Sequence, residues 1–216
     1  MKKLAYHPPA AVARLKRADP QLAALIARVG KFSLALRPAV TPFDSLLQAI
    51  VYQQLSGRAA AAIHARLRAM YPRNRPLPQH VVETADCDLR AAGLSWAKGA
   101  AAKDLAQKTL AGTVPANRRL RGMDDEEIIQ RLCEVRGVGR WTVEMLLIFH
   151  QGRPDVLPVD DLGIRKGFKY AFNLRKPPDA KRLSAHGERW RPYRSVASWY
   201  LWRAVDLHEG LRNRPD

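Results

Sequence analysis

Helix start and stop signals follow one another along the whole 216-residue chain, and they constrain its fold more than any other feature. Asp19-Pro20 and Thr41-Pro42 each join an N-cap residue to a proline suited to the first helical turn, and Gly30 fits a helix C-terminus. Residues 31–40 alternate only weakly and contain a proline, so we expect an extended linker there rather than a strand. The expected helices include residues 43–54, 78–85, 86–92, 95–112, 140–150, 162–172 and 192–208. The pattern predicts an all-α protein.

The charge of the chain points to a polyanionic partner. Lys and Arg number 37 against 20 Asp and Glu, which gives a formal net charge of +17. Hydrophobic residues make up 47% of the sequence, so the chain can bury a core and is no solvated basic tail. Nucleic acid is the first candidate partner, and an anionic membrane surface is the second.

Several protein classes are excluded by what the sequence lacks. Two cysteines, Cys87 and Cys133, are too few for a disulfide scaffold or a four-cysteine metal site, and the six histidines are scattered. No apolar run approaches the roughly 18 residues of a membrane helix. Pro8 and Pro9 interrupt the lysine-led N-terminus before any signal-peptide core. We expect an intracellular, cytoplasmic protein.

The sharpest local feature is a short glycine-rich turn between two amphipathic segments. Gly137-Val138-Gly139 separates them, and glycines let the backbone turn tightly and approach a ligand closely. The amides of Gly139, Arg140 and Trp141 are then expected at the positive end of the second helix, which favours an anion such as phosphate. Val138 is expected to pack back between the two helices. An ordinary tight helix–helix turn is the alternative interpretation.

Residues 135–142 resemble the helix-hairpin-helix of the DNA glycosylase superfamily whose motif includes a Gly/Pro-rich loop and a downstream aspartate. That loop has its counterpart at residues 157–164. Other segments are similar to the 3-methyladenine DNA glycosylase branch: residues 50–56, residues 191–195 with the aromatic residues at 199–202, and, more weakly, residues 89–95. The resemblance covers roughly residues 40–205 in the family's order.

The resemblance implies an organisation and an activity. Two helical subdomains are expected to flank a cleft, one formed by residues 1–42 with 146–216 and the other by residues 43–145, with the helix-hairpin-helix at about 125–150. The implied activity is that of a monofunctional, monomeric glycosylase acting on double-stranded DNA. It flips out alkylated purines and hydrolyses the N-glycosidic bond. The preferred lesion among 3-methyladenine, 7-methylguanine, 1-methyladenine and deaminated purines stays open.

Asp160 and Asp161 are the candidate catalytic carboxylates. Either one is a good N-cap for the helix that follows. A fixed carboxylate can also stabilise the oxocarbenium ion that forms as a glycosidic bond breaks, and can orient the attacking water. The resemblance selects Asp161, because the family's aspartate stands three residues before an aliphatic residue, here Ile164.

Aromatic residues are the candidates for holding the base. The resemblance places base-pocket walls at Trp141 and Trp202, with Met145 and Tyr52 nearby, whereas Trp199 is expected in the core. An electron-rich indole attracts a cationic alkylpurine. Bifunctional relatives carry a lysine nucleophile where this chain has Trp141, so the resemblance implies no strand cleavage. Core packing is the usual alternative for such residues.

Leu55 matches the side chain that glycosylases insert into the duplex when a base leaves the stack. A buried leucine at a helix end is the alternative. The predicted DNA contacts are Gln54, Leu55, Ser56, Arg58, Gly137, Val138, Gly139, Arg140 and Thr142.

Hairpins of this family commonly hold a monovalent cation on main-chain oxygens. The matching carbonyls are those of Cys133, Val135 and Val138, so we expect no required cofactor but a structural Na⁺ or K⁺ there.

Two other functions are alternatives to the enzyme: a non-catalytic helix-hairpin-helix module that only binds duplex DNA, and a helix-turn-helix regulator. The turn is too short and glycine-rich for the regulator.

Overall fold

The computed structural model describes residues 4–36 and 41–210 of the chain. In these residues the secondary structure is helical and no strand is formed, which confirms the all-α prediction. None of their helices has the length and apolar character needed to cross a membrane. The chain divides into two compact units, one made of residues 1–38 and 147–216 and the other of residues 39–146. Part of the predicted linker, residues 37–40, lies outside the described residues.

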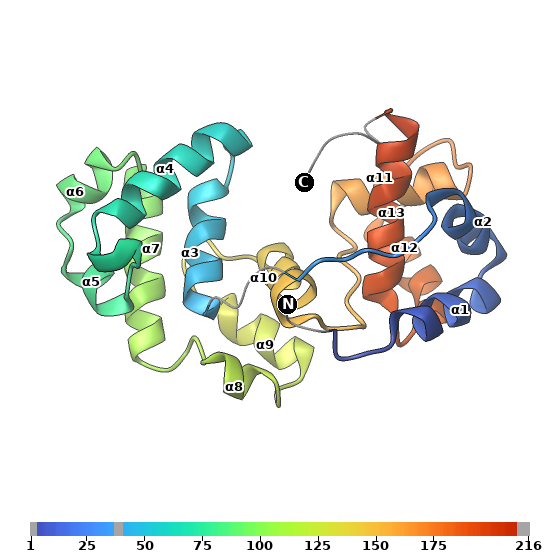
Figure 1. The fold of residues 1–216 in the computed structure, drawn as a ribbon, viewed down its shortest axis with the longest axis horizontal. Helices are drawn as coiled ribbons and strands as arrows, with labels where there is room; N and C mark the ends of the chain where they lie inside the picture. The colour runs from blue at the N-terminus through green and yellow to red at the C-terminus, as the bar shows by residue number, and fades with distance from the viewer. Residues whose placement is uncertain (1–3, 37–40, 211–216) are drawn as a thin grey trace. The chain divides into compact units, whose positions relative to one another are not determined.

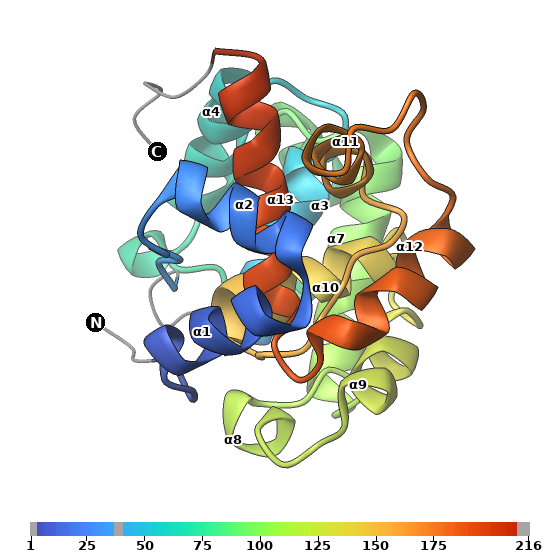
Figure 2. The same cartoon turned by 90° about the vertical axis from the view of Figure 1, so that its right-hand side faces the viewer.

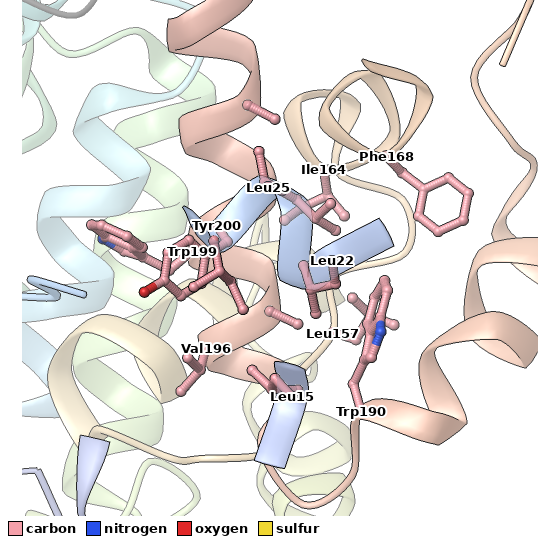
Figure 3. Packing of buried hydrophobic residues seen from close by; sticks show 14 of the residues in the cluster. Leu15, Leu22, Leu25, Leu157, Ile164, Phe168, Trp190, Val196, Trp199 and Tyr200 are labelled. Atoms are coloured by element: carbon pink, nitrogen blue, oxygen red, sulfur yellow. The ribbon is translucent and has the colours of Figure 1, made fainter. Parts of the chain in front are cut away.

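The first unit combines the two ends of the chain. Its helices are α1 (Pro8–Ala18), α2 (Pro20–Val29), the π-helical segment η2 (Leu147–Gln151), α11 (Leu162–Ala171), α12 (Ala180–Gly187), the short 3₁₀ helix η3 (Glu188–Trp190) and α13 (Arg194–His208). Helices α1 and α2 pack against α13, and α13 packs along α11 (Figure 2). The side chains of this core converge from α1, α2, α11, η3 and α13 (Figure 3). Tyr200 and Trp190 are its largest fully buried residues.

The second unit is continuous in sequence. Its helices are α3 (Pro42–Tyr52), α4 (Gly57–Ala69), the 3₁₀ helix η1 (Pro72–Asn74), α5 (Pro78–Glu83), α6 (Asp86–Ala91), α7 (Trp96–Leu110), α8 (Asn117–Leu120), α9 (Asp125–Leu132) and α10 (Arg140–Leu146). Helix α7 lies between α3 on one side and α5 and α6 on the other (Figure 1). Helix α10 packs against α9 and α3, so the hairpin lies beside the C-terminal end of α3.

The predicted caps explain where several helices begin. Asp19 accepts hydrogen bonds from the amides of Gln21 and Leu22, and Thr41 forms a capping box with Asp44. Gly30 ends α2 with a φ of 87°. Each of these signals is local, and each helix starts or stops where the sequence predicts.

Two helix ends and two whole helices differ most from the prediction. The expected helix over 140–150 is α-helical only to Leu146 and continues as a π-helix to Gln151. The last helix begins at Arg194 rather than at Pro192, because the Arg194 amide donates to Asp155 Oδ1 at 3.2 Å and fixes the first turn. Helices α8 and α12 were not predicted.

Candidate active site and nucleic-acid interface

Asp161 is the N-cap of α11 and is held by two donors. Its Oδ1 accepts a hydrogen bond from the Ile164 amide at 2.7 Å and a second from the indole Nε1 of Trp202 at 2.9 Å. The carboxylate is half-buried, whereas Asp160 beside it is exposed. Of the two candidate carboxylates it is therefore Asp161 that caps α11, and the two bonds fix the orientation of its carboxylate.

Two glycines of α11 allow Trp202 to reach Asp161. A Cβ at Gly167 would lie 1.9 Å from the Leu201 carbonyl oxygen, so α11 and α13 approach each other at backbone distance. A Cβ at Gly163 would lie 3.0 Å from both Asp161 Oδ1 and Trp202 Cδ1. A side chain at Gly167 would push α11 and α13 apart, and a side chain at Gly163 would push Asp161 and Trp202 apart.

The loop before Asp161 is fastened to the start of α13. Asp155 accepts hydrogen bonds from the guanidinium of Arg194, with Nε at 2.9 Å from Oδ1. Ser195 Oγ accepts from the Val156 amide at 2.9 Å, and Ser198 Oγ donates to the Val156 carbonyl at 3.2 Å. One helix therefore carries both Trp202 and the residues that anchor the loop before Asp161.

The predicted base-contacting residues lie in different surroundings. In the first unit Trp202 is half-buried and its ring lies 5.5 Å from that of Phe149, tilted by 31°. In the second unit Trp141 is 48% exposed at the start of α10, and Met145 lies one turn later, half-buried. Tyr52 packs edge-on against His64 with 6.0 Å between ring centroids. Trp199 is buried, in accord with its expected place in the core.

The turn between α3 and α4 presents Leu55 to the surface. Leu55 is 40% exposed, so the alternative of a buried leucine is wrong. Gln54 before it adopts a left-handed backbone with a φ of 56°. Ser56 caps α4 by accepting from the Ala59 amide at 3.5 Å, and Arg58 is exposed in the first turn.

The hairpin turn contains two glycines with different requirements. Gly137 has a φ of 75°, a conformation that side chains disfavour. Gly139 has no such φ, and a Cβ there would meet nothing within 4 Å, so neither backbone nor packing demands glycine. Val138 between them is buried, as expected. Thr142 is also buried, and its amide donates to the Gly139 carbonyl, so Val138 and Thr142 are the two predicted DNA contacts with little exposed surface.

The guanidinium of Arg140 pairs with carboxylates of its own unit. Nη2 forms a short hydrogen bond with Glu126 Oε1 on α9, and Nη1 lies 3.8 Å from Glu144 Oε1 on α10. The hydrogen bond with Glu126 raises the pKa of Arg140. The side chain would have to leave Glu126 to contact a phosphate.

The carbonyls expected to hold a cation belong to the turns that connect α9 to Gly139. The Val135 carbonyl accepts from the Val138 amide at 3.0 Å, and the Glu134 carbonyl is bound by the ammonium of Lys108. Over the described ranges, no cluster of three or more His, Cys, Asp or Glu side chains could hold a metal ion.

Comparison with known proteins decides the family. The model of the HhH-GPD superfamily of base excision DNA repair proteins matches residues 47–192, which include the turn at Leu55, the hairpin and Asp161. The chain belongs to the HhH-GPD superfamily. It is 38% identical over 167 residues to the DNA-3-methyladenine glycosylase 1 of Schizosaccharomyces pombe, an alignment that covers 77% of this chain and 73% of the relative.

Solved HhH-GPD structures share the fold. A 3-methyladenine DNA glycosylase of Schizosaccharomyces pombe, solved in complex with abasic DNA, superposes with a TM-score of 0.80 at 33% identity and covers 96% of this chain and 100% of its own. A DNA-3-methyladenine glycosidase of Bacillus halodurans gives a TM-score of 0.85 at 32% identity and covers 97% and 95% of the two chains.

Within this HhH-GPD chain, sequence reasoning missed residues that support the site. Lys98 on α7 donates from Nζ to the carbonyls of Val51 and Gln53, both at 2.7 Å. A signal for it was present, because a lysine in the first turn of a helix opposes the helix dipole and calls for another partner. Gly163 and the Asp155–Arg194 pair gave no such local signal, since each depends on contacts between distant segments.

Proposed function

We propose that this chain is a monofunctional DNA glycosylase that removes alkylated purines from double-stranded DNA and leaves an abasic site. The observation that carries the proposal is the carboxylate of Asp161, held on one oxygen by the α11 amide and by the indole of Trp202. Family membership and the similarity to 3-methyladenine glycosylases support it.

The chemistry follows from what such a carboxylate can do. As the N-glycosidic bond breaks, positive charge builds on the deoxyribose, and a preorganised carboxylate stabilises that charge and orients the attacking water. Alkylation at N3 or N7 already makes the purine a cationic leaving group, so little acid catalysis is required. The indole faces of Trp141 and Trp202 are suited to attract that cationic base, by about 0.5–2 kcal/mol each.

DNA binding is assigned to the second unit. The exposed turn at Leu55 provides a side chain that can fill the gap left by an extruded base, with Gln54, Ser56 and Arg58 beside it. The amides of Gly139, Arg140 and Trp141 provide donors for a backbone phosphate. The open space around Gly139 supports this, since it lets a phosphate approach the main chain. We expect the protein to act as a monomer.

A Na⁺ or K⁺ at the hairpin is part of the same proposal. The carbonyls of Cys133, Val135 and Val138 would hold it, and the ion would bring positive charge to the phosphate site. The absence of a side-chain cluster for metal in the described residues is compatible with main-chain ligands. Replacing alkali ions with tetramethylammonium at constant ionic strength should then weaken binding to damaged and intact duplexes alike.

The deciding experiment compares Asp161→Asn with Asp160→Asn in release of free base from methylated DNA. We expect Asp161→Asn to keep the fold and DNA binding while slowing release by on the order of 100-fold or more. Asp160→Asn, an equal change at an exposed carboxylate, should retain near-normal release. Normal release by Asp161→Asn would refute the assignment. A wild-type protein that binds duplex DNA but releases no base would instead be the non-catalytic helix-hairpin-helix module.

The product should be an intact strand with an abasic site. Trp141 has no amine to form a Schiff base with the sugar. Borohydride treatment during the reaction should therefore trap no covalent protein–DNA adduct, and an adduct that forms at the rate of excision would contradict the monofunctional assignment.

A further inference from the structure

The last carbonyls of α3 are bound by a lysine from another helix. Lys98 Nζ donates to the carbonyl oxygens of Val51 and Gln53, each at 2.7 Å. The final carbonyls of a helix have no partner within the helix and carry its negative end, so an ammonium is well suited to cap them. Lys98 thus ties α7 to the point where the chain leaves α3.

The position of Lys98 in its own helix is unfavourable. It stands in the first turn of α7, where the positive end of the helix dipole repels an ammonium. Burial also lowers the pKa of Lys98. The two hydrogen bonds to the α3 end favour the charged ammonium. A residue placed only to stabilise α7 would be acidic or neutral at this position.

The turn that follows is held from a second side as well. The side-chain Nε2 of Gln53 donates to the Gly137 carbonyl at 2.7 Å, which joins this turn to the hairpin. Gln54 then adopts a left-handed backbone, and Leu55 is left 40% exposed. Ser56 fixes the far end of the turn as the cap of α4. The exposed leucine thus lies on the four-residue turn 53–56, which is held at both of its ends.

We propose that Lys98 is a positioning residue for the inserted side chain: by holding the Val51 and Gln53 carbonyls, it fixes the turn that presents Leu55 for filling a gap in the DNA stack. This inference rests on the proposed function. Lys98 acts through Leu55 and not on phosphate, because its ammonium is engaged with two carbonyls of its own unit. It therefore sets the selectivity of binding, not its general strength.

A double-mutant cycle tests the inference. The protein is titrated with a duplex containing a tetrahydrofuran abasic analogue and with the matched intact duplex, and the ratio of the two dissociation constants measures selectivity. Lys98→Met should reduce this ratio by on the order of tenfold, comparable to the loss of one charged hydrogen bond. Leu55→Ala should also reduce it. In the Leu55→Ala background, Lys98→Met should cause no further reduction, since its effect passes through the leucine.

Three further variants separate positioning from charge and from folding. Lys103→Met removes the same charge from the same helix, where Lys103 pairs with Asp86, and should leave the ratio unchanged. Lys98→Arg keeps donors for the two carbonyls and should restore most of the ratio. If Lys98→Met does not fold, Lys98→Gln, which removes the charge but keeps an N–H donor, enters the same cycle with Leu55→Ala and should be equally non-additive.

The outcomes are distinct. The inference would be overturned if Lys98→Met and Leu55→Ala each lowered the ratio of dissociation constants independently, so that their effects multiplied in the double mutant. An unchanged ratio in folded Lys98→Met would also overturn it. Equal weakening of both duplexes with a flatter salt dependence would also overturn it, since Lys98 would then contact phosphate directly. Failure of the proposed function would appear separately, as wild-type protein that releases no base from methylated DNA.

Discussion

Trp202 donates its indole N–H to the carboxylate oxygen of Asp161 that also caps α11, at 2.9 Å. The same aromatic residue can therefore orient the carboxylate through its edge and attract a cationic base through its face. Trp202→Phe separates these two roles, because phenylalanine keeps an aromatic face but has no N–H.

We expect Trp202→Phe to slow single-turnover release of 3-methyladenine or 7-methylguanine by about tenfold, the effect of losing one hydrogen bond to a charged group. Binding of abasic DNA should change little. Trp96→Phe is the matched control, since Trp96 is 64% exposed on α7 and its ring lies beside the guanidinium of Arg90. Equal rates for wild type and Trp202→Phe would show that the indole N–H has no part in catalysis.

Gly163→Ala tests the same contact without changing either partner. The new methyl group would meet Asp161 Oδ1 and Trp202 Cδ1, both at 3.0 Å, and should displace the indole from the carboxylate. Alanine also favours the helix by up to about 1 kcal/mol over glycine. Base release should therefore fall several-fold while the melting temperature stays level or rises. Gly122→Ala, at a position with room for a methyl group, should leave the rate unchanged.

The sequence predicts the local parts of this structure well. Caps such as Asp19 and Thr41 act within their own helix, so their signals can be read from a few residues. Helix α12 also has such a cap, at Asp179, but Leu183 is its one buried apolar side chain, and its His186 bonds to Asp19 far away in the sequence. Contacts between segments more than 100 residues apart leave no local pattern.

The same distinction applies to the candidate site. The sequence of residues 191–195 resembles the family motif, but it does not say what the motif does. In the structure Arg194 and Ser195 bind the loop before Asp161. Arg140 was predicted as a phosphate contact, and its pairing with Glu126 depends on how α9 packs on α10. Residue types could suggest the chemistry, whereas the partners that orient each group required the fold.

Asp19 gives a prediction for stability against pH. Burial alone would raise its pKa, but hydrogen bonds from His186, the Leu22 amide and Trp190 outweigh burial, and the pKa lies below its ordinary value. A carboxyl with a depressed folded pKa stabilises the protein above the unfolded value of about 4, and this contribution is lost as the pH falls through the folded pKa.

Asp19→Asn should therefore lower the free energy of unfolding at pH 7 by about 1.5–3 kcal/mol, although asparagine still caps α2. The difference from wild type should shrink at pH 3, as measured by urea unfolding. Asp179→Asn makes the same change at the exposed cap of α12 and should cost much less at pH 7. If the free energies of unfolding of wild type and Asp19→Asn differed by the same amount at pH 7 and pH 3, the depressed pKa of Asp19 would be contradicted.

The pairing of Arg140 with Glu126 predicts an unusual gain in DNA affinity. Glu126→Gln weakens the carboxylate hold on the guanidinium, which can then turn to a phosphate beside the hairpin amides. Affinity should rise for damaged and intact duplexes alike, and the slope of log affinity against log salt should steepen by about one. Glu127→Gln is the control. It changes the net charge by the same amount on the same helix but leaves the Arg140–Glu126 pair intact, so it measures the effect of net charge on DNA affinity alone. Adding Arg140→Ala should abolish the gain of Glu126→Gln. If both glutamine variants bind equally tightly with equal salt slopes, the side chain of Arg140 is no phosphate ligand, and the hairpin binds through its amides.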